Sequence, residues 1–279
     1  MTQRRLKQPD LERRTEMNNP APSNTAEPAY HNDLFLDGDD GRPIRILAEY
    51  LEPLHRLKRE GIHDTIVFFG SARMKEDGPL GQYYQDARLL ARCLTEWSLK
   101  LQGSKRFVIC SGGGGGIMEA ANRGAADVGG STIGFNIGLP HEQRPNPYVS
   151  PTLLFEFHYF FMRKLWFSYL ARALIVFPGG FGTLDEMMEM LTLAQTHKLD
   201  REVIIILYGS EYWKEVIGFE ALVKHGMIAA DDLKLIHFVD NVQVALDLLK
   251  SRLPKEKELG NPAIAKTRFS RRKIEGSTK

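Results

Sequence analysis

The sequence has few or none of the residue groups on which several classes of protein depend. It contains two cysteines, Cys93 and Cys110, which are too few for a disulfide framework and favour a reducing compartment. No apolar run reaches the roughly 18 to 20 residues of a membrane-spanning helix. The polar N-terminal residues are not followed by the apolar segment of a secretory signal. We therefore expect a cytoplasmic protein that has no membrane partner.

Two kinds of ligand-binding motif are also missing. Neither a His-Glu-x-x-His nor a Cys-x-x-Cys pattern occurs, so we expect no metal ion. No Gly-Lys precedes a serine or threonine, which excludes the phosphate-binding loop of nucleoside triphosphatases. A site for phosphate would have to be built differently.

Charge is unevenly distributed although the net charge is only +2. Residues 250–279 carry a net charge of +7, whereas residues 29–249 carry −6. The acidic body argues against a nucleic-acid enzyme. The basic tail could contact nucleic acid, but it has few aromatics and no binding fold, so we expect a solvated tail and no nucleic-acid partner. Composition predicts a mobile N-terminal arm at 1–30, one catalytic domain at 31–252 and a basic C-terminal tail at 253–279.

Strand and helix patterns alternate through the central part of the chain. Continuous apolar runs are typical of strands buried on both faces of a parallel sheet, and periodic runs are typical of covering helices. We expect an α/β fold, a Rossmann-like doubly wound parallel sheet with helices on both faces. The predicted strands are 65–69, 107–110, 131–136, 174–177, 203–207 and 235–239, and the predicted helices are 44–58, 83–101, 117–125, 153–170, a segment after 182, 212–223 and 242–249.

The sequence at 174–186 is the most informative. A buried strand is followed by Pro178-Gly179-Gly180, and a helix is expected to start near Thr183. Glycine leaves backbone N–H groups uncovered, and a helix N-terminus adds partial positive charge, so this turn could hold a phosphate. The alternative is a tight turn in which Asp185 and Glu186 only stabilise the helix dipole.

Three other segments supply candidate site residues. Ser71 and Arg73 follow the first predicted strand, at the sheet edge where open α/β folds bind ligands. Gly113 and Gly114 lie in a run of five glycines, but the next strand ends without the acidic residue of a dinucleotide site, so the run is expected to let a nucleotide approach closely. Glu142, in a proline-rich loop, could contact substrate or lie at the surface.

Arg163 and Lys164 lie inside a strongly apolar segment. Burial of two cations without partners is costly, so they require an anion. That anion could be a ligand or a neighbouring acidic side chain.

The string from Pro178 to Glu186 resembles the PGGxGTxxE signature of the Lonely Guy (LOG) family, often labelled "possible lysine decarboxylase". Arg163-Lys164 is similar to the Arg-Lys pair that precedes the signature in that family. The resemblance extends from about Thr65 to about Leu249.

This resemblance implies a phosphoribohydrolase that needs no cofactor, acts on AMP or N6-modified cytokinin AMP, and assembles as a homodimer or larger homo-oligomer. It implies catalytic roles for Glu186 and Arg163. The substrate-binding candidates are Gly179, Gly180, Gly182, Thr183, Lys164, Gly113, Gly114, Ser71, Arg73, Glu142 and Asp185. A carrier of nucleotide or molybdenum cofactor with the same fold is the alternative, whereas no motif supports pyridoxal-dependent lysine decarboxylation.

A carboxylate suits glycoside cleavage because it can stabilise an oxocarbenium-like sugar while activating water. Since the turn offers its donors to one dianionic group, AMP should be cleaved far better than adenosine. We also expect ATP to be a poor substrate, on the premise that the cradle is closed.

Overall fold

The computed structural model describes residues 26–101, 105–138, 144–199 and 201–253, and the chain divides into two compact units, Met1–Ala48 and Glu49–Lys279. The described part of the first unit contains the short helices η1 (Ala29–His31) and α2 (Asp33–Asp37) and the start of α3 (Arg42–Arg59). The Asn32 side chain caps α2 by accepting the Phe35 N–H at 3.1 Å. The proposed boundaries at 30 and 252 stay predictions.

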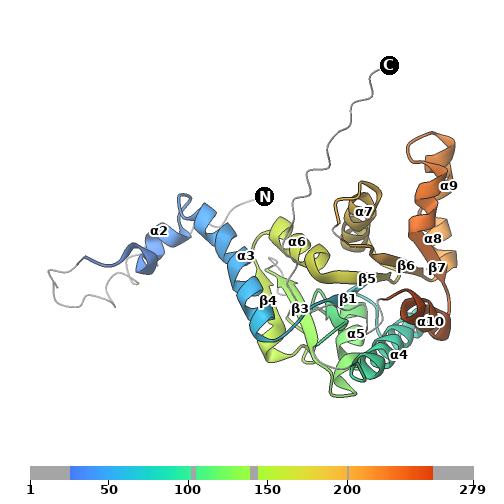
Figure 1. The fold of residues 1–279 in the computed structure, drawn as a ribbon, viewed down its shortest axis with the longest axis horizontal. Coiled ribbons are helices and arrows are strands. Elements are labelled where there is room, and N and C mark those ends of the chain that lie inside the picture. Colours follow the sequence, from blue (N-terminus) through green and yellow to red (C-terminus); the bar gives the residue numbers. More distant parts are fainter. Residues whose placement is uncertain (1–25, 102–104, 139–143, 200, 254–279) are drawn as a thin grey trace. The chain divides into compact units, whose positions relative to one another are not determined.

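The second unit is built on a seven-stranded sheet in which every neighbouring pair is parallel (Figure 1). The strand order is β4-β3-β2-β1-β5-β6-β7, and β1 and β6 are buried along their whole length. The predicted α/β Rossmann-like fold is confirmed. The strands are β1 (Thr65–Phe69), β2 (Val108–Ser111), β3 (Thr132–Ile137), β4 (Leu154–Phe157), β5 (Ala171–Val176), β6 (Ile204–Tyr208) and β7 (Ile236–Val239).

Helices pack on both faces of this sheet (Figure 1). One face is covered by α4 (Gly81–Ser98), α5 (Ile117–Ala126) and α10 (Val242–Arg252), and the other by α6 (Phe160–Leu170) and α7 (Phe181–Gln195). Phe167 of α6 packs edge-on against Phe69 of β1, with ring centroids 4.8 Å apart. The remaining elements are η2 (Pro151–Leu153), α8 (Ser210–Val216), α9 (Phe219–Lys224) and η3 (Ala230–Leu235).

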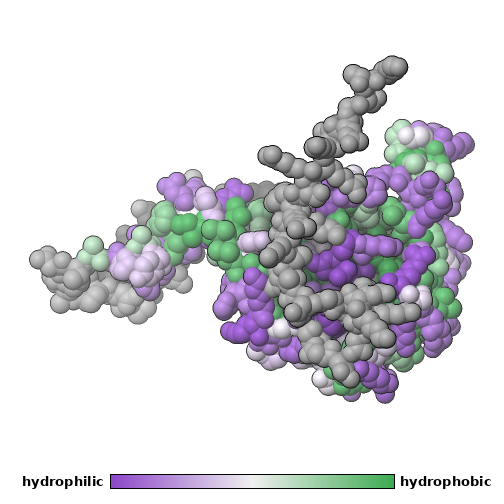
Figure 2. Space-filling view, in the orientation of Figure 1, coloured by the Kyte–Doolittle hydropathy of each residue, from purple (hydrophilic) through white to green (hydrophobic). Residues whose placement is uncertain are grey.

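In the view of Figure 2, an apolar region of the second unit lies on α9 and the turn after it, where Leu222 and Met227 are exposed. Within the described ranges, none of the helices is long and apolar enough to cross a membrane.

Two element predictions are wrong. The segment 153–170 was expected to be one helix, but β4 precedes α6 within it, because Phe155 and Phe157 are buried and alternate with an exposed Glu156, as in an edge strand. The segment 212–223 was also expected to be one helix. It forms α8 and α9, which are separated at Ile217-Gly218.

The direction of winding reverses between β1 and β5. From β1 the strands proceed to β2, β3 and β4 on one side, and to β5, β6 and β7 on the other. Ligands of open α/β sheets bind at the carboxyl ends of the strands where this reversal occurs. The turns that follow β1 and β5 meet there, since the Ser71 N–H donates to the Pro178 carbonyl at 3.0 Å.

Candidate active site

The turn after β5 exposes backbone donors at the start of α7. Gly180 is the N-cap, and the first intrahelical bond runs from the Leu184 N–H to the Gly180 carbonyl at 3.0 Å. The N–H groups of Phe181, Gly182 and Thr183 therefore have no acceptor within the helix. Together with the helix dipole they form a cradle for an anion such as phosphate.

The glycines of this cradle have different structural roles. A Cβ at Gly179 would lie 2.1 Å from Thr183 Oγ1 and 3.0 Å from the Ser71 backbone nitrogen, so only glycine fits there. A Cβ at Gly180 or Gly182 would meet nothing within 4 Å. These two positions have room for side chains but carry none, which leaves the cradle open to an incoming ligand.

A cavity of about 770 Å³ opens over the cradle. This volume lies within the range of sites for small molecules and cofactors. Its lining brings together nine of the residues predicted from the sequence: Ser71, Arg73, Arg163, Gly179, Gly180, Gly182, Thr183, Glu186 and the exposed Asp185.

Glu186 and Arg163 face each other in this cavity. Glu186 lies one turn inside α7, and its Oε1 is 3.8 Å from Arg163 Nη1 of α6. The Arg163 Nε donates to the Phe135 carbonyl at 2.8 Å, and the guanidinium lies 5.2 Å from the Phe167 ring centroid. The hydrogen bond to Phe135 and the ring contact with Phe167 hold the Arg163 guanidinium in place. Neither contact involves the Glu186 carboxylate.

The burial of this pair changes its electrostatics. Burial raises the pKa of Glu186 to about 7, against the opposing effect of Arg163 and Lys164. Burial also lowers the pKa of Arg163. Among the described residues, none donates a hydrogen bond to the Glu186 carboxylate, so its oxygens are available to a ligand. A carboxyl group with a pKa near 7 can exchange a proton at neutral pH.

Gly112 is a site residue that the sequence reasoning missed. A Cβ at this position would lie 2.5 Å from Arg163 Nη2 and 2.7 Å from Met118 Sδ. The absence of a side chain at Gly112 therefore makes room for the guanidinium. The glycine run after β2 predicted that a nucleotide approaches the backbone closely. At Gly112 the group that approaches is instead the Arg163 side chain.

Gly113 and Gly114 do not line the cavity. Gly113 has a φ of +73° and packs against Gly134, since an added Cβ would lie 3.3 Å from the Gly134 Cα. The Asn146 side chain donates to the carbonyls of both glycines, at 3.0 and 2.9 Å. The structure thus gives these two glycines a packing role.

Lys164 is held by acidic side chains. Its Nζ lies 2.8 Å from Asp185 Oδ1 and 3.0 Å from Glu189 Oε2. Lys164 does not line the cavity, so the neighbouring acids supply the anion that its burial requires. Glu142, the remaining candidate, lies outside the described residues.

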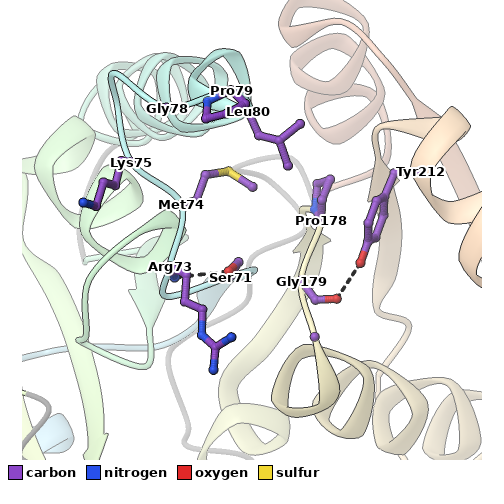
Figure 3. A pocket seen from close by; sticks show the side chains of 11 residues that line it. Ser71, Arg73, Met74, Lys75, Gly78, Pro79, Leu80, Pro178, Gly179 and Tyr212 are labelled. Carbon is purple, nitrogen blue, oxygen red and sulfur yellow. Dashed lines mark hydrogen bonds between the residues drawn. The ribbon is translucent and has the colours of Figure 1, made fainter.

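Tyr212 of α8 also lines the cavity and was not anticipated. Its hydroxyl donates to the Gly179 carbonyl at 2.8 Å and so fixes one peptide of the cradle (Figure 3). Its only sequence signal was a tyrosine at the start of a predicted helix. As for metals, no group of three or more His, Cys, Asp or Glu in the described ranges could hold an ion.

Comparison with known proteins confirms the resemblance. The family model described as possible lysine decarboxylase matches residues 118–249. The cytokinin riboside 5′-monophosphate phosphoribohydrolase LOG of Oryza sativa subsp. japonica is 27% identical over 183 residues, which are 64% of this chain and 69% of the rice protein. LOG2 of Arabidopsis thaliana, with the same enzyme name, is 24% identical over 191 residues, 68% of this chain and 83% of its own. The solved molybdenum cofactor carrier protein of Chlamydomonas reinhardtii has 20% identity and a TM-score of 0.43, and the match covers 69% of this chain and 99% of the carrier.

Proposed function

From this relationship to the LOG family, we propose that the protein is a nucleoside 5′-monophosphate phosphoribohydrolase. It would hydrolyse the N-glycosidic bond of AMP or of an N6-modified cytokinin AMP, and release the free base and ribose 5-phosphate. The observation that carries the proposal is the buried Glu186, which faces Arg163 one helical turn beyond an anion cradle in the same cavity.

The spacing along α7 suits this substrate. Glu186 is the third residue after Thr183 of the cradle, which corresponds to a rise of about 4.5 Å along the helix. With the 5′-phosphate on the cradle, the ribose would extend along the first turn toward the carboxylate. Binding energy from the phosphate could then position the sugar and lower the barrier to cleavage.

The chemistry needs a carboxylate that can both receive a proton and stabilise positive charge. As the bond from C1′ to the base nitrogen breaks, the sugar becomes oxocarbenium-like, and the negative charge of Glu186 opposes that developing charge. Glu186 would also accept a proton from the water that attacks C1′. The departing base takes up a proton from solvent, and Glu186 later returns to solvent the proton that it accepted. Arg163 is suited to hold sugar hydroxyl groups through its planar donors.

A non-catalytic carrier of the same fold would need the cradle alone. A buried carboxylate with a raised pKa and no hydrogen-bond donor costs stability, and binding of an anion gives no reason to keep it. This pairing of Glu186 with the cradle favours the enzyme over the carrier.

The test is to incubate the protein with nucleoside monophosphates and resolve free bases by chromatography, with adenosine as the matched control. We expect kcat/KM for AMP to exceed that for adenosine by at least about a hundredfold, because adenosine leaves the cradle donors without a partner. Comparable values would mean that the cradle is only structural. Binding of AMP without release of adenine would instead favour the carrier.

The proposal extends to assembly and location. Exposed aromatic side chains lie at the mouth of the cavity, with Phe181 92% exposed and Phe160 also largely exposed. Burial of such surface against a second copy would be favourable, which supports a homodimer or larger homo-oligomer. The paucity of cysteine supports a cytoplasmic location.

A further inference from the structure

A second pocket, of about 420 Å³, adjoins the anion cradle. It shares Ser71, Arg73, Gly179, Gly180 and Tyr212 with the main cavity, whereas Glu186 and Arg163 line the main cavity only. The Gly179-Gly180 turn at the edge of the cradle is therefore common to both spaces, whereas the cradle donors at Phe181, Gly182 and Thr183 line the main cavity only. A phosphate on those donors would face the catalytic candidates within the main cavity, and across the Gly179-Gly180 turn it would adjoin the second pocket.

The walls of the adjoining pocket are mainly apolar. Met74 is 8% exposed, Pro178 is buried, and Pro79 and Leu80 complete the lining with the ring of Tyr212. Figure 3 shows the side chains of Met74 and Leu80 directed toward Pro178 and Tyr212. Such walls favour an apolar or aromatic group, whose burial is worth roughly 25 cal/mol for each Å² removed from water.

Two cations, Arg73 and Lys75, line this pocket, but neither side chain is directed at its apolar walls (Figure 3). The Arg73 guanidinium is directed toward the start of α7, and within the described ranges it has no ion-pair partner (Figure 3). Lys75 extends away from Gly179 and Tyr212 in the same view. A further phosphate in the apolar interior would lose its hydration without a cation to compensate.

We propose that the adjoining pocket binds an aromatic or apolar group joined through the 5′-phosphate of the substrate, so that the site accepts 5′-phosphodiesters of nucleosides as well as monophosphates. This inference rests on the proposed function for the position of the phosphate. It also corrects the premise that the cradle is closed, since the structure shows space beyond it. ATP should still bind poorly, but because the space is apolar.

Calorimetric titration of the full-length protein with two diesters tests this directly. Adenosine 5′-(phenyl phosphate) carries a ring beyond the phosphate, and adenosine 5′-(methyl phosphate) is the matched control with the same charge. We expect the phenyl ester to bind about tenfold more tightly, from partial burial of the ring. Equal affinities, or tighter binding of ADP than of the phenyl ester, would overturn the proposal.

The variant Leu80→Ser tests whether the phenyl ring lies in the adjoining pocket. Leu80 lines the adjoining pocket but not the main cavity, and it is the N-cap of α4, where serine is favoured. We expect the preference for the phenyl ester to fall at least about threefold while affinity for the methyl ester is kept. An unchanged preference would place the ring elsewhere and overturn the assignment.

Failure of the two ideas can be told apart. If AMP and the esters bind but no adenine is released, the proposed hydrolysis fails and the phenyl-to-methyl ratio still decides the pocket. If adenine is released from AMP but the two esters bind equally, only the pocket assignment fails. If none of these ligands binds, both are wrong.

Discussion

Two buried carboxylates lie at opposite ends of the same sheet, and each has an arginine beside it. At the start of β1, Asp64 is 1% exposed, lies 2.5 Å from Arg106 Nη2 and accepts the Phe107 N–H at 2.7 Å. Beyond the carboxyl ends of the strands, Glu186 is 7% exposed, and its closest cation is 3.8 Å away. The two pairs thus differ in how fully the acid is satisfied.

This difference separates a structural pair from a reactive one. Arg172 adds a second guanidinium to Asp64, with its Nε at 3.7 Å, so the carboxylate joins the starts of β1, β2 and β5. Buried acids that are paired and hydrogen-bonded hold a fold together once formed. Glu186 has a partner too distant for a strong hydrogen bond, which leaves it able to act on a ligand.

The largest expected effect is the loss of turnover when the charge of Glu186, the reactive carboxylate, is removed. Glu186→Gln keeps the size of the side chain, and we expect turnover of AMP to fall by at least about a hundredfold, the lower end of general-base effects. Nucleotide affinity, measured by calorimetry, should change little because the cradle is intact. Near-normal turnover would remove Glu186 from the mechanism and make the two carboxylates alike.

The corresponding substitution of Asp64, the structural carboxylate, should lower the stability of the fold. Asp64→Asn leaves the buried Arg106 and the half-buried Arg172 without an opposite charge, and we expect the free energy of unfolding to fall by about 3 kcal/mol. Denaturant titration measures this fall. The same variant should keep its turnover per folded molecule at temperatures where it is folded, and a selective loss of turnover would contradict the division of roles.

Glu186 should also make stability depend on pH. Its pKa is raised to about 7 in the folded protein, so the folded state holds a proton that the unfolded state releases near the usual 4.5. The stabilisation is complete below about 4.5 and is lost as the pH rises through about 7, a change of about 2 kcal/mol after allowance for partial solvation.

Denaturant titrations of the wild type and Glu186→Gln at pH 5 and pH 8 isolate this contribution as the difference between their pH dependences. Over the same interval kcat/KM for AMP should rise, because the base must be ionised. A wild-type protein whose stability and kcat/KM both stay flat between these pH values would show that Glu186 does not titrate there.

The smallest expected effect tests the partner of Glu186. Arg163→Lys keeps the positive charge but loses the planar donors and the hydrogen bond from Nε to Phe135, so we expect kcat/KM for AMP to fall at least about tenfold. Steady-state kinetics measures the change, with Lys164→Arg as a control because Lys164 does not line the cavity. Full activity of Arg163→Lys would mean that a point charge suffices.

Local sequence was enough to predict much of the fold. Continuous apolar runs predicted a strand at 203–207, which the structure has at Ile204–Tyr208. The glycine turn predicted a helix start near Thr183, and α7 begins two residues earlier, at Phe181. The edge strand β4 was missed because its Leu-Phe-Glu-Phe sequence joins an aromatic helix without a turn signal between them. Pattern alone does not distinguish a short strand from the first turn of a helix in such a run.

The sequence by itself determined the family resemblance, the parallel sheet and the residues of the cradle, because each depends on a short motif or a local period. Only the tertiary structure decided which acidic side chain of α7 lies beside which cation of α6. Asp185 and Glu186 are adjacent in the chain, yet Lys164 pairs with the first and Arg163 faces the second. Successive helical residues point about 100° apart, so which one enters a cavity depends on how α7 packs against α6.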